Sequence, residues 1–326
     1  MPGNRERLAV PRPPAVVFDG GVWRGEGAAG AFTARPVDQG PPGAVWVDDH
    51  REQGDPWALA QGLFAASPSI LTLLYPAGQA LPMHDAWLAP HGDTPWRLDR
   101  AAFWQGGGPW AVRRPPFPEV PVMNADGRRH PRRPPVPAGE LYRRYDVDLG
   151  AWVSLRTLDR ALDLERFHRW QNSERVAAFW EEAGSLEAHR AYLDRLFDDP
   201  RSQAVIGCLD DDPFAYFEVY WAKEDRIAPY CDADDYDRGI HMLVGEDRYR
   251  GPRTVKAWLT ALCHYLFLDD PRTRRVLSEP RFDNRRMIDH LLARRFAKLK
   301  EFDFPHKRAA LMSLSREAFF EHCELS

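Results

Sequence analysis

One stretch of the chain, crowded with proline and arginine, divides the sequence. Between Arg113 and Pro137 it reads RRPPFPEVPVMNADGRRHPRRPPVP, with almost no periodic apolar pattern. Because proline lacks a backbone N–H donor and biases its neighbours toward extended conformations, this stretch predicts a semi-rigid connector. We interpret its arginines as solvated linker residues in preference to an anion-binding patch. A connector over 113–145 leaves an N-terminal domain over 1–112 and a C-terminal domain over 146–326.

Charge and apolar patterning exclude several classes of protein. The formal net charge of −4 gives no electrostatic reason to expect a nucleic-acid partner. No apolar run approaches the roughly 20 residues that cross a bilayer, and the N-terminus lacks the apolar segment of a signal peptide. We therefore expect a cytosolic protein with no membrane partner. The cysteines form no CxxC pair and are expected to be reduced thiols: Cys208, Cys231, Cys263 and Cys323.

The residues before the connector predict a small α+β domain. The short apolar runs AVVFDG, AVWVDD and SILTLLYP lie between Gly- and Pro-rich segments and predict strands, and PWALAQGLFAA predicts a helix. No residue cluster in this part points to chemistry. His84 and Asp85 are adjacent in LPMHDAW but belong to no motif, so we expect them in a surface turn.

The residues after the connector show regular apolar periodicity. The pattern predicts helices, an antiparallel run of strands, and a strand–helix–strand–helix–strand finish. The expected helices cover 158–170, 173–182, 186–197, 252–268 and 283–296. The expected strands cover 152–155, 203–209, 214–221, 240–245, 274–280, 297–304 and 308–314. This order predicts an α+β sheet with helices on both faces.

Four stretches accompany that element order. They are HRWQNSERVAAFWEE from His168, YFEVYWAKEDRIAPYCDADDYDRGIH from Tyr216, RYRGPRT from Arg248 and FLDDPRTRRVLSEPRFDNRRMIDHLLARRF from Phe267. Over residues 150–315 the chain resembles the GNAT acyltransferase fold, and most closely its siderophore-biosynthesis branch of hydroxylysine acetyltransferases and the mycobactin lysine acyltransferase. Aminoglycoside N-acetyltransferases share a looser version of the pattern. Longer family members carry a degenerate GNAT-like domain before the catalytic one, and the resemblance implies one here.

The resemblance implies two catalytic residues, His241 and Glu279. Alternation in IHMLVG places Ile240 and Met242 on one face of a strand and turns His241 to the other, where a cleft can form. Taken alone, a histidine in a strand is more often structural, and a glutamate beside Arg281 reads as a surface carboxylate. The match to the family's catalytic histidine and second carboxylate favours proton transfer for both.

An acyl-CoA site needs a place for the pyrophosphate, and a helix N-terminus supplies free N–H groups for it. Arg248 and Gly251 fit the family signature Q/R-x-x-G-x-G/A, whereas Arg253 departs from its last position. The alternative interpretation of this segment is a basic loop at the start of a helix that binds no ligand. Asn284 matches the position that helps to hold the CoA arm in many relatives. The residues expected to bind the cofactor are Leu243, Val244, Arg248, Arg250, Gly251, Pro252, Arg253, Thr254 and Asn284.

An acidic and aromatic loop, 230–237, suits recognition of an amine. A calcium-binding cluster is the other reading of these carboxylates, but the spacing lacks the glycine and distal glutamate of an EF-hand. The aromatic residues implied as pocket walls are equally readable as core. The residues expected to bind the substrate are Trp170, Asn172, Tyr220, Trp221, Tyr230, Asp232 and Asp237.

The resemblance implies an enzyme that transfers an acetyl or other short acyl group from acyl-CoA. The expected acceptor is the hydroxylamine nitrogen of an N-hydroxylated lysine, ornithine or diamine, and the product is a siderophore hydroxamate. His241 is expected to act as general base and Glu279 to orient or shuttle the proton, with no metal. A siderophore synthetase is the expected protein partner. Two alternatives stay open: acetylation of another amine, such as an aminoglycoside or plain lysine, and a non-catalytic CoA-binding scaffold.

Overall fold

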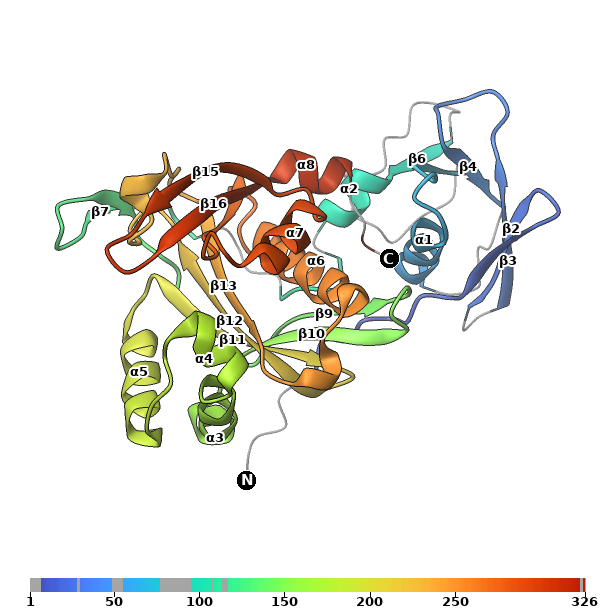
Figure 1. Cartoon of the computed structure of the whole chain (residues 1–326). Helices are drawn as coiled ribbons and strands as arrows, with labels where there is room; N and C mark the ends of the chain where they lie inside the picture. The colour runs from blue at the N-terminus through green and yellow to red at the C-terminus, as the bar shows by residue number, and fades with distance from the viewer. Residues whose placement is uncertain are drawn as a thin grey trace. The chain divides into compact units, whose positions relative to one another are not determined.

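The computed structural model describes residues 7–27, 30–48, 55–76, 95–106, 108–112, 117–322 and 325 (Figure 1). These residues form two compact units. The larger unit contains the described parts of 111–143 and 152–319, and the smaller unit contains those of 9–110 and 144–151. His84, Asp85 and Cys323 lie outside the described residues.

The smaller unit is built on a sheet whose strands follow chain order, β1 to β6. Strands β4 and β5 are parallel and are joined by helix α1, whereas the other neighbours are antiparallel. Asp55 caps α1 by accepting a hydrogen bond from the backbone N–H of Trp57 at 2.8 Å, and proline occupies the first turn. The elements are β1 (Val16–Asp19), β2 (Val22–Gly27), β3 (Gly30–Pro36), β4 (Ala44–Val47), α1 (Pro56–Ala66), β5 (Thr72–Tyr75), β6 (Trp96–Asp99) and α2 (Arg100–Gln105).

The range expected to be a connector contains ordered elements. Strands β7 (Pro121–Met123) and β8 (Arg129–Pro131) form a hairpin, and β9 (Glu140–Asp146) is the edge strand of the larger sheet. Prolines begin β7 and end β8, positions in a two-stranded ribbon where a missing N–H interrupts no central ladder.

The larger unit is built on an eight-stranded sheet of order β15-β16-β14-β13-β12-β11-β10-β9. Its further strands are β10 (Ala151–Thr157), β11 (Ser202–Leu209), β12 (Asp212–Trp221), β13 (Arg238–Val244), β14 (Arg275–Ser278), β15 (Ala297–Asp303) and β16 (Arg308–Ser315). Its helices are α3 (Arg160–Gln171), α4 (Glu174–Trp180), α5 (Leu186–Asp198), α6 (Pro252–Asp269), α7 (Arg285–Leu292) and α8 (Arg316–Glu321), with short 3₁₀ turns η1 (Ala228–Tyr230) and η2 (Asp247–Tyr249).

Helices cover both faces of this sheet (Figure 1). On one face, Phe167 and Leu193 from α3 and α5 join a buried cluster with Tyr216 of β12. On the other face, Trp258 of α6 stacks on Phe217 with ring centroids 5.1 Å apart. Because neighbouring residues of a strand point to opposite faces, one strand serves both layers. The α+β prediction with helices on both faces is confirmed.

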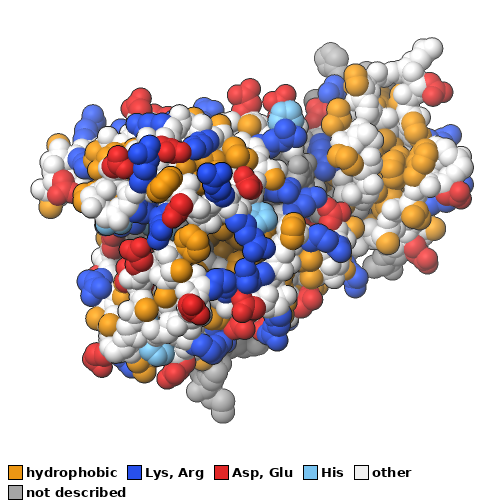
Figure 2. Space-filling model, in the orientation of Figure 1, with side chains coloured by type: hydrophobic (Ala, Val, Ile, Leu, Met, Phe, Trp, Pro, Cys, Tyr) orange, Lys and Arg blue, Asp and Glu red, His pale blue; other side chains and the backbone are white. Residues whose placement is uncertain are grey.

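The surface of the larger unit mixes charges of both signs. On the face shown in Figure 2, Lys and Arg side chains are interspersed with Asp and Glu. Among the described helices, none is long and apolar enough to cross a membrane. Cys208 and Cys263 are buried free thiols, and Cys231 is a half-buried one.

Candidate active site

The site forms where two parallel strands separate. Strand β13 pairs with β14 only at Arg238 with Val276 and at Gly239 with Leu277. The next contact is a side-chain hydrogen bond, in which Ser278 Oγ donates to the carbonyl of Ile240 at 3.3 Å. The rest of β13 keeps β12 on one edge and is unpaired with β14 on the other. A gap therefore opens in the sheet at the residues that follow.

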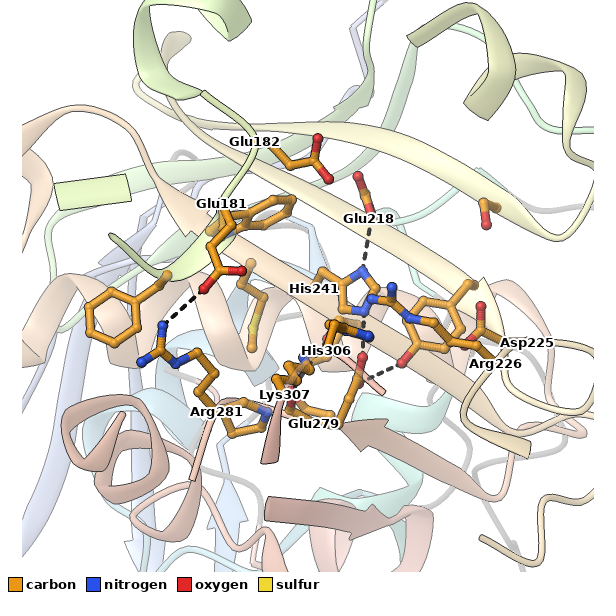
Figure 3. A pocket seen from close by; sticks show the side chains of 18 of the residues that line it. Glu181, Glu182, Glu218, Asp225, Arg226, His241, Glu279, Arg281, His306 and Lys307 are labelled. Atoms are coloured by element: carbon orange, nitrogen blue, oxygen red, sulfur yellow. Dashed lines mark hydrogen bonds and ion pairs between the residues drawn. The ribbon is translucent and has the colours of Figure 1, made fainter. Parts of the chain in front are cut away.

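His241 and Glu279 lie at this opening, one on each strand (Figure 3). His241 Nε2 is 2.6 Å from Glu279 Oε1. The other carboxylate oxygen accepts a hydrogen bond from the Tyr220 hydroxyl at 2.7 Å, and Lys307 Nζ donates to the backbone carbonyl of Glu279 at 2.8 Å. Glu279 is only 2% exposed, so its charge is held by these partners and not by water.

A second carboxylate, Glu218, holds the opposite side of the imidazole. Its Oε2 lies 2.9 Å from His241 Nδ1, and the two residues are direct cross-strand neighbours in the β12–β13 register. Its Oε1 accepts hydrogen bonds from the hydroxyls of Tyr216, at 2.8 Å, and Tyr192. Glu218 fixes the orientation of the imidazole ring through this contact.

The two carboxylates set the charge of the histidine. Burial alone would lower the pKa of His241, but the charges and hydrogen bonds of Glu279 and Glu218 outweigh burial and raise that pKa to about 10. Burial would likewise raise the pKa of Glu279, yet His241, Lys307 and the Tyr220 hydroxyl lower it to about 2. The two carboxylates therefore favour the protonated, imidazolium form of His241.

Gly239 makes room for the ring of Tyr220. The two residues face each other across β12 and β13, and a Cβ on Gly239 would lie 2.0 Å from the tyrosine ring. Real side chains do not approach so closely. A glycine at this position is therefore needed for Tyr220 to reach Glu279.

A pocket of about 520 Å³ surrounds this network. Four residues expected at the site line it: Tyr220, His241, Glu279 and Asn284. Asn284 also caps α7, since its side chain accepts a hydrogen bond from the backbone N–H of Met287 at 3.2 Å. The other charged side chains at the pocket wall are Glu181, Glu182, Asp199, Arg201, Glu218, Asp225, Arg226, Arg281, His306 and Lys307.

Two residues expected at the substrate site are structural parts of α3. Trp170 is 2% exposed, lies against Gly245, and donates its ring N–H to Glu246 at 2.9 Å. Asn172 ends α3 and exchanges two hydrogen bonds of 3.0 Å with the backbone of Gly184. Neither lines the pocket.

Two further aromatic residues expected at the pocket wall lie elsewhere. Trp221 is buried between the guanidinium groups of Arg133 and Arg238, at 4.3 and 4.0 Å from its ring. Tyr230 packs against Phe302, with ring centroids 4.7 Å apart. These contacts match the alternative reading of the aromatics as packing residues.

The acidic loop binds an arginine of the same unit. Asp237 is fully buried and accepts hydrogen bonds from the guanidinium group of Arg275, at 2.9 Å from Nε and 2.6 Å from Nη2. Asp232 offers its backbone carbonyl to the same arginine. These two aspartates stabilise the loop and do not line the pocket.

Some of the residues expected to form a pyrophosphate cradle lie at the start of α6. Gly251, with a φ of 140°, precedes the helix and provides no side-chain cap for its first N–H groups. Pro252 occupies the first turn, followed by Arg253 and Thr254, in a helix of 18 residues. The helix start therefore keeps backbone donors that suit an anion.

The neighbouring residues of the expected cradle are held by local contacts. Arg248 pairs with Asp212, and Arg250 lies 3.4 Å from Asp247. The end of β13 carries two other residues that were expected to bind the cofactor. Leu243 is buried in a core cluster with residues of α3, and the backbone carbonyl of Val244 accepts a hydrogen bond from an arginine side chain.

Sequence reasoning missed Glu218 and its two tyrosine partners. Glu218 is the one charged residue in the apolar run FAYFEVYW, which is a signal that was available. A lone charge in a buried strand requires a partner. What the sequence does not give is the register that sets this glutamate opposite His241.

Among the described residues, no group of three or more His, Cys, Asp or Glu side chains is arranged to hold a metal ion.

Known protein families and solved structures show which class of protein the larger unit belongs to. The sequence profile described as "Acetyltransferase (GNAT) domain" matches residues 159–304. The fold is also that of an uncharacterized protein from Bacillus halodurans, with a TM-score of 0.54 and 28% identity over 56% of this chain and 93% of that one. The larger unit is therefore a GNAT acyltransferase domain.

Relatives then identify the family. The chain is 44% identical to the N(6)-hydroxylysine O-acetyltransferase of Escherichia coli, over 68% of this chain and 71% of that protein. It is 41% identical to the N(5)-hydroxyornithine:cis-anhydromevalonyl coenzyme A-N(5)-transacylase of Beauveria bassiana, over 69% of this chain and 58% of that protein. The chain belongs to the siderophore-biosynthesis family of GNAT acyltransferases, as its sequence motifs predict. It is an enzyme that uses acyl-CoA as co-substrate.

Proposed function

We propose that the chain transfers an acetyl or other short acyl group to the hydroxylamine nitrogen of an N-hydroxylated lysine, ornithine or diamine. The product is a hydroxamate of the kind found in siderophores. The observation that carries this proposal is the imidazole of His241 held between Glu218 and Glu279 at the gap in the sheet. The names of the two relatives support an N-hydroxylated acceptor.

The acyl-CoA would lie along the free edge of β13. Its pyrophosphate would meet the N–H groups that begin α6, at Gly251 and the residues after it. The thioester would then reach the opening beside His241. A backbone N–H of β13 after His241 would donate to the oxyanion of the tetrahedral intermediate.

The proton transfers follow from the charges in the site. As nitrogen bonds to the acyl carbon, Glu279 accepts the proton that nitrogen loses. As the carbon–sulfur bond breaks, His241 gives its proton to the departing CoA sulfur, and the proton on Glu279 passes back to His241 across 2.6 Å. The sequence predicts His241 as the base; we propose that it serves as the acid instead, because the two carboxylates favour its protonated form. Glu218 orients the imidazole throughout.

The first test is release of free thiol from acetyl-CoA with different acceptors. We expect turnover with N6-hydroxylysine, N5-hydroxyornithine, N-hydroxycadaverine or N-hydroxyputrescine, and much less with plain lysine or an aminoglycoside. Ferric iron added to the product distinguishes the attacking atom, since a hydroxamate gives a coloured complex and an O-acyl product does not. Thiol release that is fastest with plain amines would contradict the proposal, as would CoA binding without any release.

The same proposal includes the setting of the reaction. We place it in the cytosol, without a metal cofactor, and with a siderophore synthetase as the protein that uses the hydroxamate. The N-terminal residues 1–112 are proposed to be a degenerate GNAT-like domain, because the parallel pair joined by α1 repeats the topology of the parallel pair joined by α6. Purified enzyme treated with a chelator should keep its full rate.

A further inference from the structure

Three cationic side chains in the pocket form no ion pair with a carboxylate side chain of any described residue. Arg226, His306 and Lys307 line the pocket beside Glu279. Lys307 Nζ binds only the backbone carbonyl of Glu279, and no ion pair or hydrogen bond joins the side chain of Arg226 or His306 to any described residue. In Figure 3 the three lie near Glu279, whereas Glu182 lies beyond His241.

A single aromatic ring holds the three side chains together. The guanidinium carbon of Arg226 is 5.7 Å from the centre of the Phe304 ring, Lys307 Nζ is 5.5 Å from it, and the ring of His306 stacks on it at 5.3 Å. Phe304 is 6% exposed and is packed in the core below them. The cluster is therefore supported by the fold.

The positive charges in this cluster repel one another. Burial, with the charges of Arg226 and Lys307, lowers the pKa of His306. Burial also lowers the pKa of Lys307, where the charges of Arg226 and Arg281 add to burial and the charge of Glu279 opposes it. The other two arginines that line the pocket are each paired with an aspartate at 2.7 Å, Arg281 with Asp283 and Arg201 with Asp199. A ligand carboxylate placed here would relieve the repulsion and gain charge-assisted hydrogen bonds.

We propose that Arg226, His306 and Lys307 form a carboxylate-binding site in the acceptor pocket. This inference rests on the proposed function. The ligand group has two possible sources: the α-carboxylate of an N-hydroxylated amino acid, or the terminal carboxylate of a dicarboxylic acyl group on CoA. The first source fits the wall beyond His241 as well, because Glu182 has no ion pair among the described residues and would face an α-ammonium group (Figure 3).

The test compares substrates that differ by one carboxylate. N6-hydroxylysine and N-hydroxycadaverine differ only in the α-carboxylate, and succinyl-CoA and acetyl-CoA differ in the terminal one. Thiol release is measured for the four combinations, and calorimetry measures binding of each acceptor separately. If the acceptor supplies the carboxylate, N6-hydroxylysine binds about 10- to 100-fold more tightly than N-hydroxycadaverine, and Arg226→Gln removes the difference. If the acyl group supplies it, succinyl-CoA is preferred and the same variant removes that preference.

A matched variant separates a local effect from a general one. Arg190 is exposed on α5 and outside the pocket, so Arg190→Gln removes the same charge elsewhere and should leave all four combinations unchanged. Arg226→Glu should turn the preference toward N-hydroxycadaverine, whose second amine is cationic. Equal binding of both acceptors together with equal use of both acyl groups by the wild type overturns the inference. An Arg226→Gln effect that is the same for all four combinations overturns it too, because the residue would then serve the shared CoA phosphates.

Calorimetry also separates this inference from the proposed function. No thiol release with any combination, together with carboxylate-dependent binding that Arg226→Gln abolishes, would remove the function and leave the carboxylate site standing. Turnover of all acceptors at one rate and one affinity, with no preference for succinyl-CoA, would leave the function standing and remove the site.

Discussion

The two sheets contain the same strand–helix–strand unit, and only one of them opens. In the smaller sheet, β4 has four residues, and three of them pair with β5. In the larger sheet, β13 has seven residues, and only two pair with β14. Pro280 follows β14 closely and cannot continue a ladder of N–H donors. In this chain the candidate catalytic side chains lie at the parallel pair that separates early.

The two parallel pairs of strands also differ in their side chains, which are uncharged at β4 and β5 and include ionisable groups at β13 and β14. Strands β4 and β5 read AVWV and TLLY, without a charged residue. The separating pair carries His241 on one strand and Glu279 just after the other, with Glu218 across from them. Burying these charges is tolerated because each has a partner.

Removing the imidazole is expected to have the largest effect. His241→Ala should lower kcat by about 10²–10⁴-fold, the usual contribution of a positioned proton-transfer group. Thiol release under saturating substrates measures the loss. Calorimetric binding of CoA serves as the control and should change little, since the expected cradle lies at Gly251. A variant that retained more than half of the wild-type rate would remove His241 from the mechanism.

Weakening the orienting carboxylate should cost less. Glu218→Gln keeps the shape of the side chain but removes one of the two charges that hold His241 protonated. We expect kcat to fall about 10- to 100-fold, the value of a hydrogen bond to a charged group. The pKa of His241 should fall as well. A purely structural role would lower the midpoint of thermal unfolding and leave that pKa unchanged, which would contradict the assignment.

The sequence predicts the scaffold better than the site. The helices starting at Pro56 and Pro252 end within a residue of their predicted limits, because proline at the start and apolar periodicity are local signals. Motifs predict His241 and Glu279 as site residues. Asp237 was expected at the substrate, yet it binds an arginine 38 residues away. A carboxylate that faces a ligand and one that pairs inside the protein look alike until the fold brings their partners together.

Two glycines allow the sheets to be compared directly. Gly239 faces the ring of Tyr220 in the larger sheet, and Gly25 faces the ring of Phe32 in the smaller one, where an added Cβ would lie 2.4 Å from it. Gly239→Ala should lower kcat about tenfold by moving the tyrosine hydroxyl away from Glu279. Each alanine should also destabilise its sheet by about 1–3 kcal/mol through overpacking.

The matched pair sharpens the contrast between the two sheets. Gly25→Ala should lower the midpoint of thermal unfolding with kcat unchanged, whereas Gly239→Ala should lower both. Equal losses of kcat in the two variants would mean that activity follows general stability, and the special role of the opened pair would be lost.

The smallest expected effect is an absence of titration. Because the pKa of His241 is raised to about 10, its ring signals in ¹⁵N-histidine NMR should not move between about pH 5 and 8. His306 is the internal reference, since burial and the charges of Arg226 and Lys307 lower its pKa and its signals should move on the acidic side of the ordinary histidine value.

The raised pKa of His241 also predicts how the free energy of unfolding changes with pH. A group with a raised folded-state pKa stabilises the fold fully below its unfolded value, here 6.5, and loses that contribution as the pH rises through about 10. The contribution of His241 to the free energy of unfolding should therefore decline above neutral pH, and His241→Asn should flatten this decline. In Glu218→Gln, by contrast, the pKa of His241 should fall, so that its NMR signals begin to move with pH between about pH 5 and 8. A His241 resonance that already titrates near pH 6.5 in the wild type would show a neutral imidazole, and would restore it as the base that takes the proton from nitrogen.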